Sequence, residues 1–218
     1  MALSYLPIDD VLGELVAAVR ARKTAVLHAP TGAGKTTRLP GALLNAGLAG
    51  DRKVIVLEPR RIAARAAARR IAEERGSRLG GEVGWQVRFE RVCGRDTRIL
   101  FVTKGVFVRM LQDDPFLDSV GAVVFDEFHE RSLDADLALA MTRRVREEVR
   151  PDLAIVAASA TLDVEPIARY LGDAPIVRSA GRTFPVDVHY WPAGDGRPTL
   201  DRVSSGIAQA LESSPGDV

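Results

Sequence analysis

Cysteine, net charge and long apolar runs are scarce in this sequence, and each scarcity excludes a class of protein. The 218 residues contain one cysteine, Cys93, which excludes an internal disulfide and a zinc site built from several cysteines. No apolar run reaches the length that spans a membrane, and the first residues, MALSYLPIDD, lack the basic and apolar regions of a signal peptide. We therefore expect a reducing, cytoplasmic setting and no membrane partner.

The charge balance excludes strong general attraction to polyanions. The formal net charge is +1, so any contact with nucleic acid must come from a local patch rather than from the field of the whole chain. With 46% hydrophobic and 27% charged residues, the composition is that of an ordinary globular protein with a sizeable core.

Short β-branched segments alternate with longer segments rich in alanine and arginine. The short segments are almost continuously apolar, as strands covered on both faces require. Alternation of strands and helices predicts an α/β fold with a mainly parallel, doubly wound sheet and helices on both faces, which binds ligands beyond the carboxyl ends of its strands. The expected strands are 24–29, 53–58, 98–103, 122–127 and 153–159, and the expected helices are 9–21, 35–46, 61–75, 105–112, 133–149 and 164–171.

The composition changes after residue 180, where a stretch rich in glycine and proline begins. We assign 1–180 to a first domain and 181–218 to a linker and the start of a second domain. A short strand is expected at 186–191 and an amphipathic helix at 201–211. A lone helix is not a domain, so we interpret the chain as a truncated piece of a longer one.

The segment APTGAGKTT lies between the first expected strand and a helix. Its glycines allow the backbone N–H groups to turn toward an anion at the helix N-terminus, a lysine can reach the β- and γ-phosphates, and a threonine hydroxyl can ligate Mg²⁺. The alternative is a glycine-rich turn that only caps the helix. The predicted nucleotide-binding residues are Thr31, Gly32, Ala33, Gly34, Lys35, Thr36 and Thr37.

The segment AVVFDEFHERS places two carboxylates at the end of an apolar strand, where they cost free energy unless something pairs with them. Asp126 is expected to hold Mg²⁺ through water, together with Thr36. Glu127 is expected to approach the same ion through water and to deprotonate the attacking water. His129 can link this site to a moving part, or it is a polar residue without chemistry.

These segments together resemble the first RecA-like domain of superfamily 2 helicases, in the form of the DEAH-box group. APTGAGKTT, LEPRRIAAR, VTKGVFVRM, DEFHERSLDADLALA and SAT occur in that group's order and approximate spacing, and GRTFPVDVHY resembles its connection to a second RecA-like domain. Phe128 and Glu58 are more similar to the bacterial HrpB-type members. The resemblance implies a RecA-like P-loop NTPase fold that uses ATP and Mg²⁺.

The resemblance also implies an RNA site. Arg60 and Arg61 match a motif that lines the RNA channel, while Thr103 and Gly105 match a turn that contacts the backbone of single-stranded RNA. Lys104 stands where the family usually has an acidic residue. It either strengthens phosphate contact or is a surface change, and we favour the second interpretation.

Further roles implied by the resemblance concern the base and the coupling of hydrolysis to movement. Arg70 matches an arginine that stacks on the adenine, and Ser159 and Thr161 match the motif that couples hydrolysis to strand movement.

No N-terminal element that could read a base edge is apparent, so weak base selectivity is expected. The family's arginine fingers lie in the second RecA-like domain, and their Gln-Arg-x-Gly-Arg-x-Gly-Arg motif is absent here. The chain alone is therefore expected to bind nucleotide and hydrolyse it poorly.

Two interpretations of individual side chains and two rival functions remain open. Arg65 and Arg69 are interpreted as a solvated basic face, and Trp85 and Phe89 as core residues rather than base-stacking ones. The rivals to an RNA helicase motor are a P-loop ATPase acting on DNA or protein and a nucleotide-binding module without catalysis.

Overall fold

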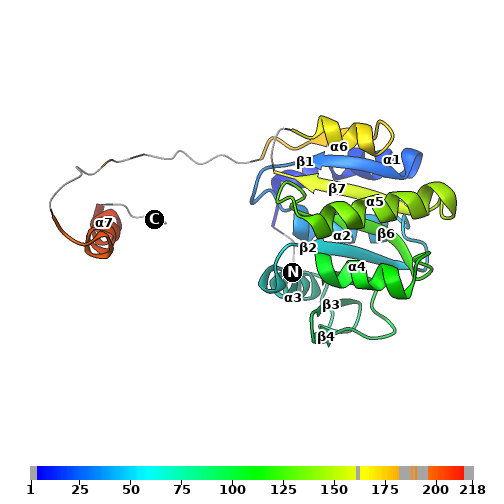
Figure 1. Ribbon diagram of the computed structural model, residues 1–218, viewed down its shortest axis with the longest axis horizontal. Helices are drawn as coiled ribbons and strands as arrows, with labels where there is room; N and C mark the ends of the chain where they lie inside the picture. The colour runs from blue at the N-terminus through cyan, green and yellow to red at the C-terminus, as the bar shows by residue number, and fades with distance from the viewer. Residues whose placement is uncertain (1–3, 161–162, 182–187, 189, 191–195, 214–218) are drawn as a thin grey trace. The chain divides into compact units, whose positions relative to one another are not determined.

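The chain divides into two compact units, residues 1–182 and 183–218 (Figure 1). The computed structural model describes residues 4–160, 163–181, 188, 190 and 196–213. The described part of the second unit contains the helix α7 (Thr199–Ser213), which confirms the helix expected at 201–211. The strand expected at 186–191 lies almost entirely outside the described residues. That this unit begins a second RecA-like domain stays a prediction.

The first unit is built on a sheet of eight strands, which is parallel except for its edge strand β4. The strand order is β4-β3-β5-β2-β6-β7-β1-β8, so consecutive parallel strands are joined by crossovers. All five expected strands are present, which confirms the mainly parallel α/β sheet. The strands are β1 (Thr24–His28), β2 (Lys53–Glu58), β3 (Val83–Val87), β4 (Glu90–Val92), β5 (Ile99–Thr103), β6 (Val120–Phe125), β7 (Ala154–Ser159) and β8 (Ile176–Arg178).

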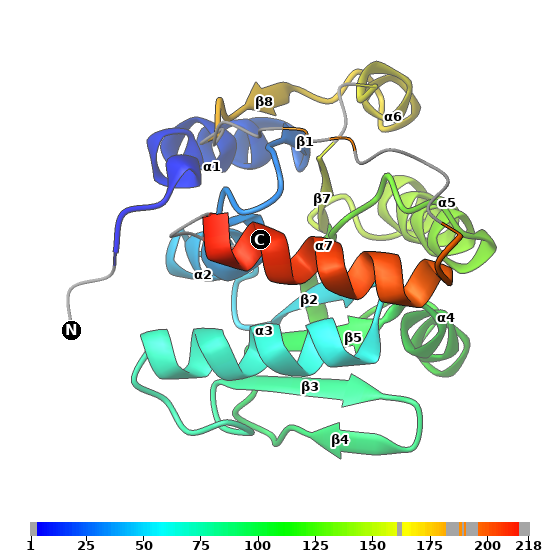
Figure 2. The same ribbon diagram turned by 90° about the vertical axis from the view of Figure 1, so that its left-hand side faces the viewer.

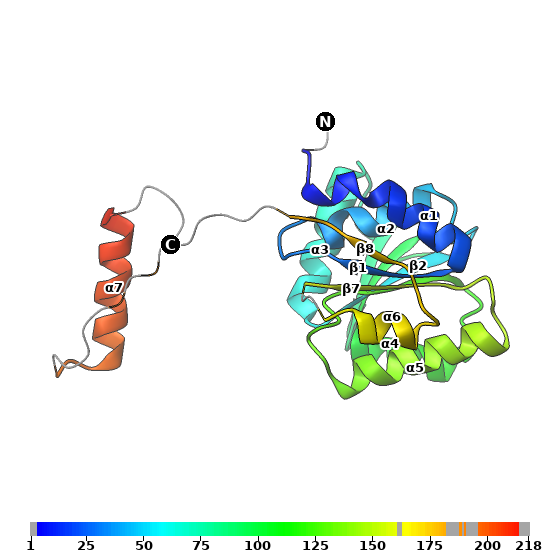
Figure 3. The same ribbon diagram turned by 90° about the horizontal axis from the view of Figure 1, so that it is seen from above.

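Helices cover both faces of this sheet (Figure 3). One buried cluster joins the sheet to α1, α2 and α3, and a second joins its other face to α4, α5 and α6. Among the described residues, no helix is both long and apolar enough to cross a membrane. The helices are the 3-10 helix η1 (Pro7–Asp10) and the α-helices α1 (Leu12–Arg22), α2 (Lys35–Asn45), α3 (Arg61–Glu74), α4 (Lys104–Asp113), α5 (Leu133–Glu148) and α6 (Glu165–Tyr170).

A hairpin of β3 and β4, with α3 packed along β3, was not expected (Figure 2). Arg65 lies over the ring of buried Trp85 at 4.9 Å and pairs with Glu90 at 2.7 Å, so it fastens α3 to the hairpin rather than forming a free solvated charge. Trp85 is confirmed as a core residue. The same expectation is wrong for Phe89, which sits at the hairpin turn with φ +69° and is 87% exposed.

Candidate nucleotide-binding site

The carboxyl ends of five parallel strands meet at one edge of the sheet, and each is followed by predicted site residues. The phosphate loop follows β1, and the carboxylates of the DEFHE segment follow β6, with the end of β7 between them. A doubly wound sheet binds ligands at this edge, so the predicted site residues lie where the fold places a ligand. The residues brought there are Lys35 after β1, Arg60 after β2, Thr103 at the end of β5, Asp126 after β6 and Ser159 at the end of β7.

The phosphate loop has the backbone that anion binding requires. Gly32 and Gly34 have φ values of +80° and +95°, a region that disfavours other residues. Lys35, the first residue of α2, is 4% exposed. Its Nζ donates to the carbonyls of Ala29 at 2.9 Å and Pro30 at 3.3 Å, so the ammonium group is held across the mouth of the loop.

The other predicted loop residues hold the loop in shape. The Thr37 hydroxyl donates to the Gly34 carbonyl at 3.1 Å. Ala33 is buried, and its carbonyl accepts from the Ile8 N–H at 3.1 Å, which joins the loop to η1. Thr31 lies exposed in the turn.

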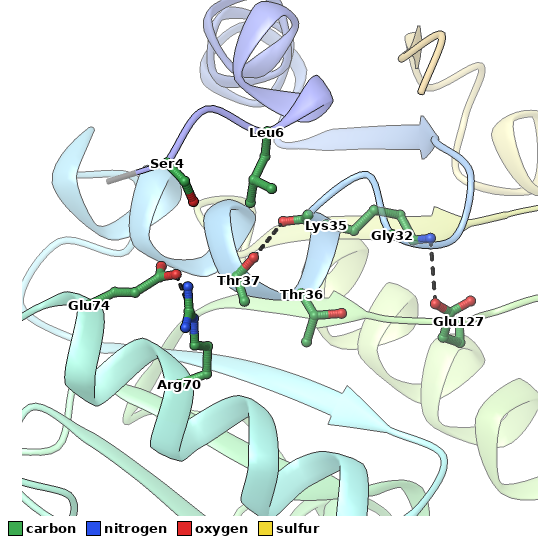
Figure 4. A pocket seen from close by; sticks show the side chains of 10 residues that line it. Ser4, Leu6, Gly32, Lys35, Thr36, Thr37, Arg70, Glu74 and Glu127 are labelled. Atoms are coloured by element: carbon green, nitrogen blue, oxygen red, sulfur yellow. Dashed lines mark hydrogen bonds and ion pairs between the residues drawn. The ribbon is translucent and has the colours of Figure 1, made fainter. Parts of the chain in front are cut away.

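One threonine hydroxyl and two carboxylates meet beside the lysine. The Thr36 hydroxyl donates to Asp126 Oδ2 at 2.5 Å. Lys35 Nζ lies 3.4 Å from Glu127 Oε1, the pair drawn in Figure 4. Glu127 has φ +46°, an uncommon conformation for a residue other than glycine, and its N–H donates to Asp126 Oδ1 at 2.8 Å. Such strain is typical of functional sites, and here it directs the Glu127 side chain toward the loop.

A third carboxylate, Glu58 at the end of β2, was not assigned to this site from the sequence. It is 3% exposed, and burial, followed by the charges of Asp126 and Glu127, raises its pKa to about 8. Its Oε1 has no hydrogen-bond partner among the described residues. Burial also raises the pKa of Asp126.

These crowded acids suit a hard divalent cation. The Thr36 hydroxyl and the Asp126 carboxylate present adjacent oxygen donors, the ligand type that Mg²⁺ prefers. A bound cation would also offset the repulsion and desolvation that raise the pKa of Asp126. The donor set therefore fits the Mg²⁺ ion that accompanies ATP.

His129 lies between Glu127 and the segment after β7. Its Nδ1 accepts from the Ala160 N–H at 3.3 Å and lies 3.3 Å from Glu127 Oε2. The atom cannot accept the first bond and donate to the carboxylate at once, so the two contacts belong to different protonation states. Ser159, which precedes Ala160, is buried, while Thr161 lies outside the described residues.

Arg70 borders the hollow in which the base of a bound nucleotide could lie. A hollow of about 330 Å³ contains Lys35 and Thr36 at one side and Arg70 at the other, and the Arg70 side chain is 58% exposed. Ser4 and Leu6 form its N-terminal wall (Figure 4). This N-terminal wall was not expected, because the turn that brings these residues to the loop has no marked sequence signal; that no N-terminal element reads a base edge, and that base selectivity is weak, stay predictions. Leu6 is apolar and offers no donor or acceptor to a base edge.

Three of the four predicted RNA residues line two neighbouring hollows. Thr103 and Gly105 border both, which measure about 460 and 590 Å³, and Arg61 borders the larger. Arg60 pairs with Glu130 at 3.0 Å and remains exposed. The four residues predicted from the resemblance therefore gather at one place on the carboxyl edge.

Lys104 is not the surface change that we expected. It is 8% exposed, and its Nζ donates to the Glu130 carbonyl at 2.8 Å. Burial lowers its pKa, with nearby acids acting in the opposite direction. Lys104 thus fastens the start of α4 to the DEFHE segment, a role that depends on a tertiary contact.

Comparisons with known proteins agree with this geometry. The family model described as DEAD/DEAH box helicase matches residues 13–170. The chain is 45% identical over 217 residues to the ATP-dependent RNA helicase HrpB of Escherichia coli, covering 99% of this chain and 27% of that protein. It is 35% identical over 215 residues to the ATP-dependent RNA helicase HrpA homolog of Haemophilus influenzae, covering 98% and 16%. A crystal structure of Escherichia coli DEAH/RHA helicase HrpB matches with a TM-score of 0.91 and 44% identity, over 98% of this chain and 27% of that one.

Proposed function

The chain belongs to the DEAD/DEAH box helicase family, and on this premise we propose that it is the ATP-binding motor domain of an ATP-dependent RNA helicase. The observation that carries the proposal is the cluster of Lys35, Thr36 and Asp126 on the same edge of the sheet as the hollows beside Arg61 and Thr103. The chain spans 27% of the length of HrpB, so single-stranded RNA and a second RecA-like domain are proposed partners. A cytoplasmic location remains a prediction from the single cysteine.

The chain's own residues can bind the triphosphate of ATP. The N–H groups of the loop and the N-terminus of α2 attract its negative charge, and Lys35 can exchange its two carbonyl partners for phosphate oxygens. A Mg²⁺ ion bound with ATP would neutralise charge on the β- and γ-phosphates. Thr36 would hold it directly, and Asp126 and Glu127 through water.

Hydrolysis requires a base beside the γ-phosphate. Glu127 lies next to Lys35 and is the carboxylate best placed to orient a water molecule and take its proton. His129 Nδ1 faces both Glu127 and the Ala160 N–H and can bond to only one of them at a time, so a change at the base can reach the segment after β7. This contact supports the coupling role proposed for Ser159 and Thr161.

The RNA side of the motor adjoins the nucleotide side through the DEFHE segment. Glu130 pairs with Arg60 through its carboxylate and with Lys104 through its carbonyl. Arg60, Arg61 and Thr103 can contact phosphate oxygens, and Gly105 leaves room for the backbone. Rotation of the segment around Glu127 would then move groups at the RNA site.

The rival motor on DNA or protein would keep the nucleotide site but would not need the hollow beside Arg61. Fluorescence polarisation of a labelled single-stranded RNA at low salt tests this. We expect weak, salt-sensitive binding, a several-fold loss in Arg61→Ala, and no loss in Arg144→Ala, which removes an exposed arginine of α5. Equal binding of single-stranded DNA and indifference to Arg61→Ala would support the rival.

Catalysis is tested separately by phosphate release from ATP with and without the same RNA. We expect slow release from the chain, which lacks the arginine-finger motif, and still less from Glu127→Gln. Unchanged release in Glu127→Gln would remove this residue from the role of base. Nucleotide binding without any release would favour the module without catalysis.

A further inference from the structure

Arg38 is a buried cation in α2, one turn beyond the phosphate loop, and it has three anionic or carbonyl partners. It is 8% exposed. Its guanidinium donates to Glu74 Oε2 at 2.6 Å and to the Ser4 carbonyl at 2.6 Å, and its Nε lies 3.3 Å from Asp9 Oδ1. A buried charge is costly unless it is paired in this way, so these contacts hold Arg38 and its partners in fixed positions.

Glu74, at the end of α3, connects this buried arginine to an exposed one. Its side chain is only 10% exposed. One carboxylate oxygen accepts from Arg38. The other accepts from Nε of Arg70 at 2.8 Å, the bond drawn in Figure 4. An isolated surface pair at this helical spacing would be weak and mobile, but here the carboxylate is fixed from behind by Arg38.

The geometry of the Arg70–Glu74 bond leaves Arg70 able to stack. A hydrogen bond to Nε lies in the plane of the guanidinium group, so it sets the direction of that plane and leaves its faces free. A base stacks on a face, not on an edge. Both Arg70 and Glu74 border the hollow that contains Lys35 and Thr36.

Arg38 also holds the opposite wall of this hollow. Its bond to the Ser4 carbonyl and its pair with Asp9 fasten the segment that carries Leu6. A side chain on Gly34 would collide with Leu6, its Cβ lying 2.6 Å from Leu6 Cδ1, so this wall lies directly on the phosphate loop. One buried arginine thus joins both walls.

We propose that Arg38 and Glu74 are positioning residues that orient Arg70 for stacking on the nucleobase. The proposal rests on the proposed nucleotide site and on Arg70 as its stacking residue. It predicts that the pair contributes to binding of the nucleoside part of a nucleotide and not to binding of its phosphates.

The test compares Mg-ADP with Mg-tripolyphosphate, which has phosphates but no base, by calorimetric titration of the 218-residue chain. We expect Arg70→Ala to weaken ADP binding about three- to tenfold, as loss of one stacking contact implies. Glu74→Gln and Arg38→Gln should weaken it about two- to fivefold. Tripolyphosphate should bind all three variants like the parent. Glu82→Gln is the matched control, because it breaks a similar pair with Arg75 that lies outside the hollow.

The outcomes distinguish failure of the stacking role of Arg70 from failure of the positioning role of Arg38 and Glu74. If Arg70→Ala binds ADP like the parent, the stacking role in the proposed function is wrong. If Arg70→Ala weakens ADP binding but Glu74→Gln and Arg38→Gln do not, the positioning role is overturned while the stacking role stands. If both ligands lose affinity equally in Glu74→Gln, the pair is merely structural and the proposal is also overturned.

Discussion

Buried charged groups at the two edges of the sheet differ in their pairing and in the direction in which the pKa of the carboxylate is shifted. At the amino edge, Arg150 is buried and donates to the carbonyls of Phe116, Leu117 and Val120 at 2.7 to 3.1 Å and to both oxygens of Asp152. These bonds hold the pKa of Asp152 at about 2. At the carboxyl edge, Glu58 is buried with its pKa raised to about 8.

The difference shows where the fold is stabilised and where it is prepared for a ligand. The amino edge satisfies its charges internally, whereas the carboxyl edge gathers acids and keeps Glu127 in a strained conformation. A cation and phosphates would compensate this cost, which is consistent with the nucleotide site proposed there.

Arg150→Met should have the largest effect on stability. The change removes the buried donor to the Leu117 and Val120 carbonyls and one of the two arginine partners of Asp152, so we expect the free energy of unfolding to fall by about 2 to 4 kcal/mol. Urea unfolding measures this. Arg144→Met, which breaks an exposed pair with Glu148, is the control and should cost less than about 0.5 kcal/mol. Similar losses in both variants would show that the two edges do not differ as described.

Glu58→Gln should have a smaller effect and depends on pH. Because the folded pKa of Glu58 is raised from 4.5 to about 8, its favourable contribution to stability is complete below pH 4.5 and is lost as the pH rises through 8. Glutamine keeps the shape without ionising. We therefore expect the variant to match the parent near pH 5 and to be about 1 to 3 kcal/mol more stable near pH 9.

Urea unfolding at these two pH values, without nucleotide or Mg²⁺, measures the difference. A stability gap that does not change with pH would mean that Glu58 is not held protonated in the fold.

The sheet, and the residues that gather at the proposed nucleotide site, could be predicted from the sequence because their signals are local. Nearly continuous apolar runs predict strands such as β2, and the glycines beside Lys35 predict the phosphate loop. The strands β3, β4 and β8 were missed, because β4 and β8 have only three residues each and β3, VGWQV, lacks the continuous apolar run of the predicted strands.

Side chains whose roles depend on distant partners could not be predicted. Lys104 was interpreted as a surface change and Arg38 was given no role, because most lysines and arginines are exposed. Their burial depends on the Glu130 carbonyl in one case and on Ser4, Asp9 and Glu74 in the other. Such partners lie far away in sequence, so only the folded chain shows them.

The nucleotide site at the carboxyl edge is tested most directly by calorimetric titration of the 218-residue chain and its Lys35→Ala variant with Mg-ADP. Lys35 is the cation held across the phosphate loop, and no other lysine is within the hollow. We predict a measurable heat of binding for the parent and a loss of affinity of about 100-fold or more in the variant, because the charged contact to the phosphates has no substitute. Equal affinities for the two proteins would contradict the assignment of this site.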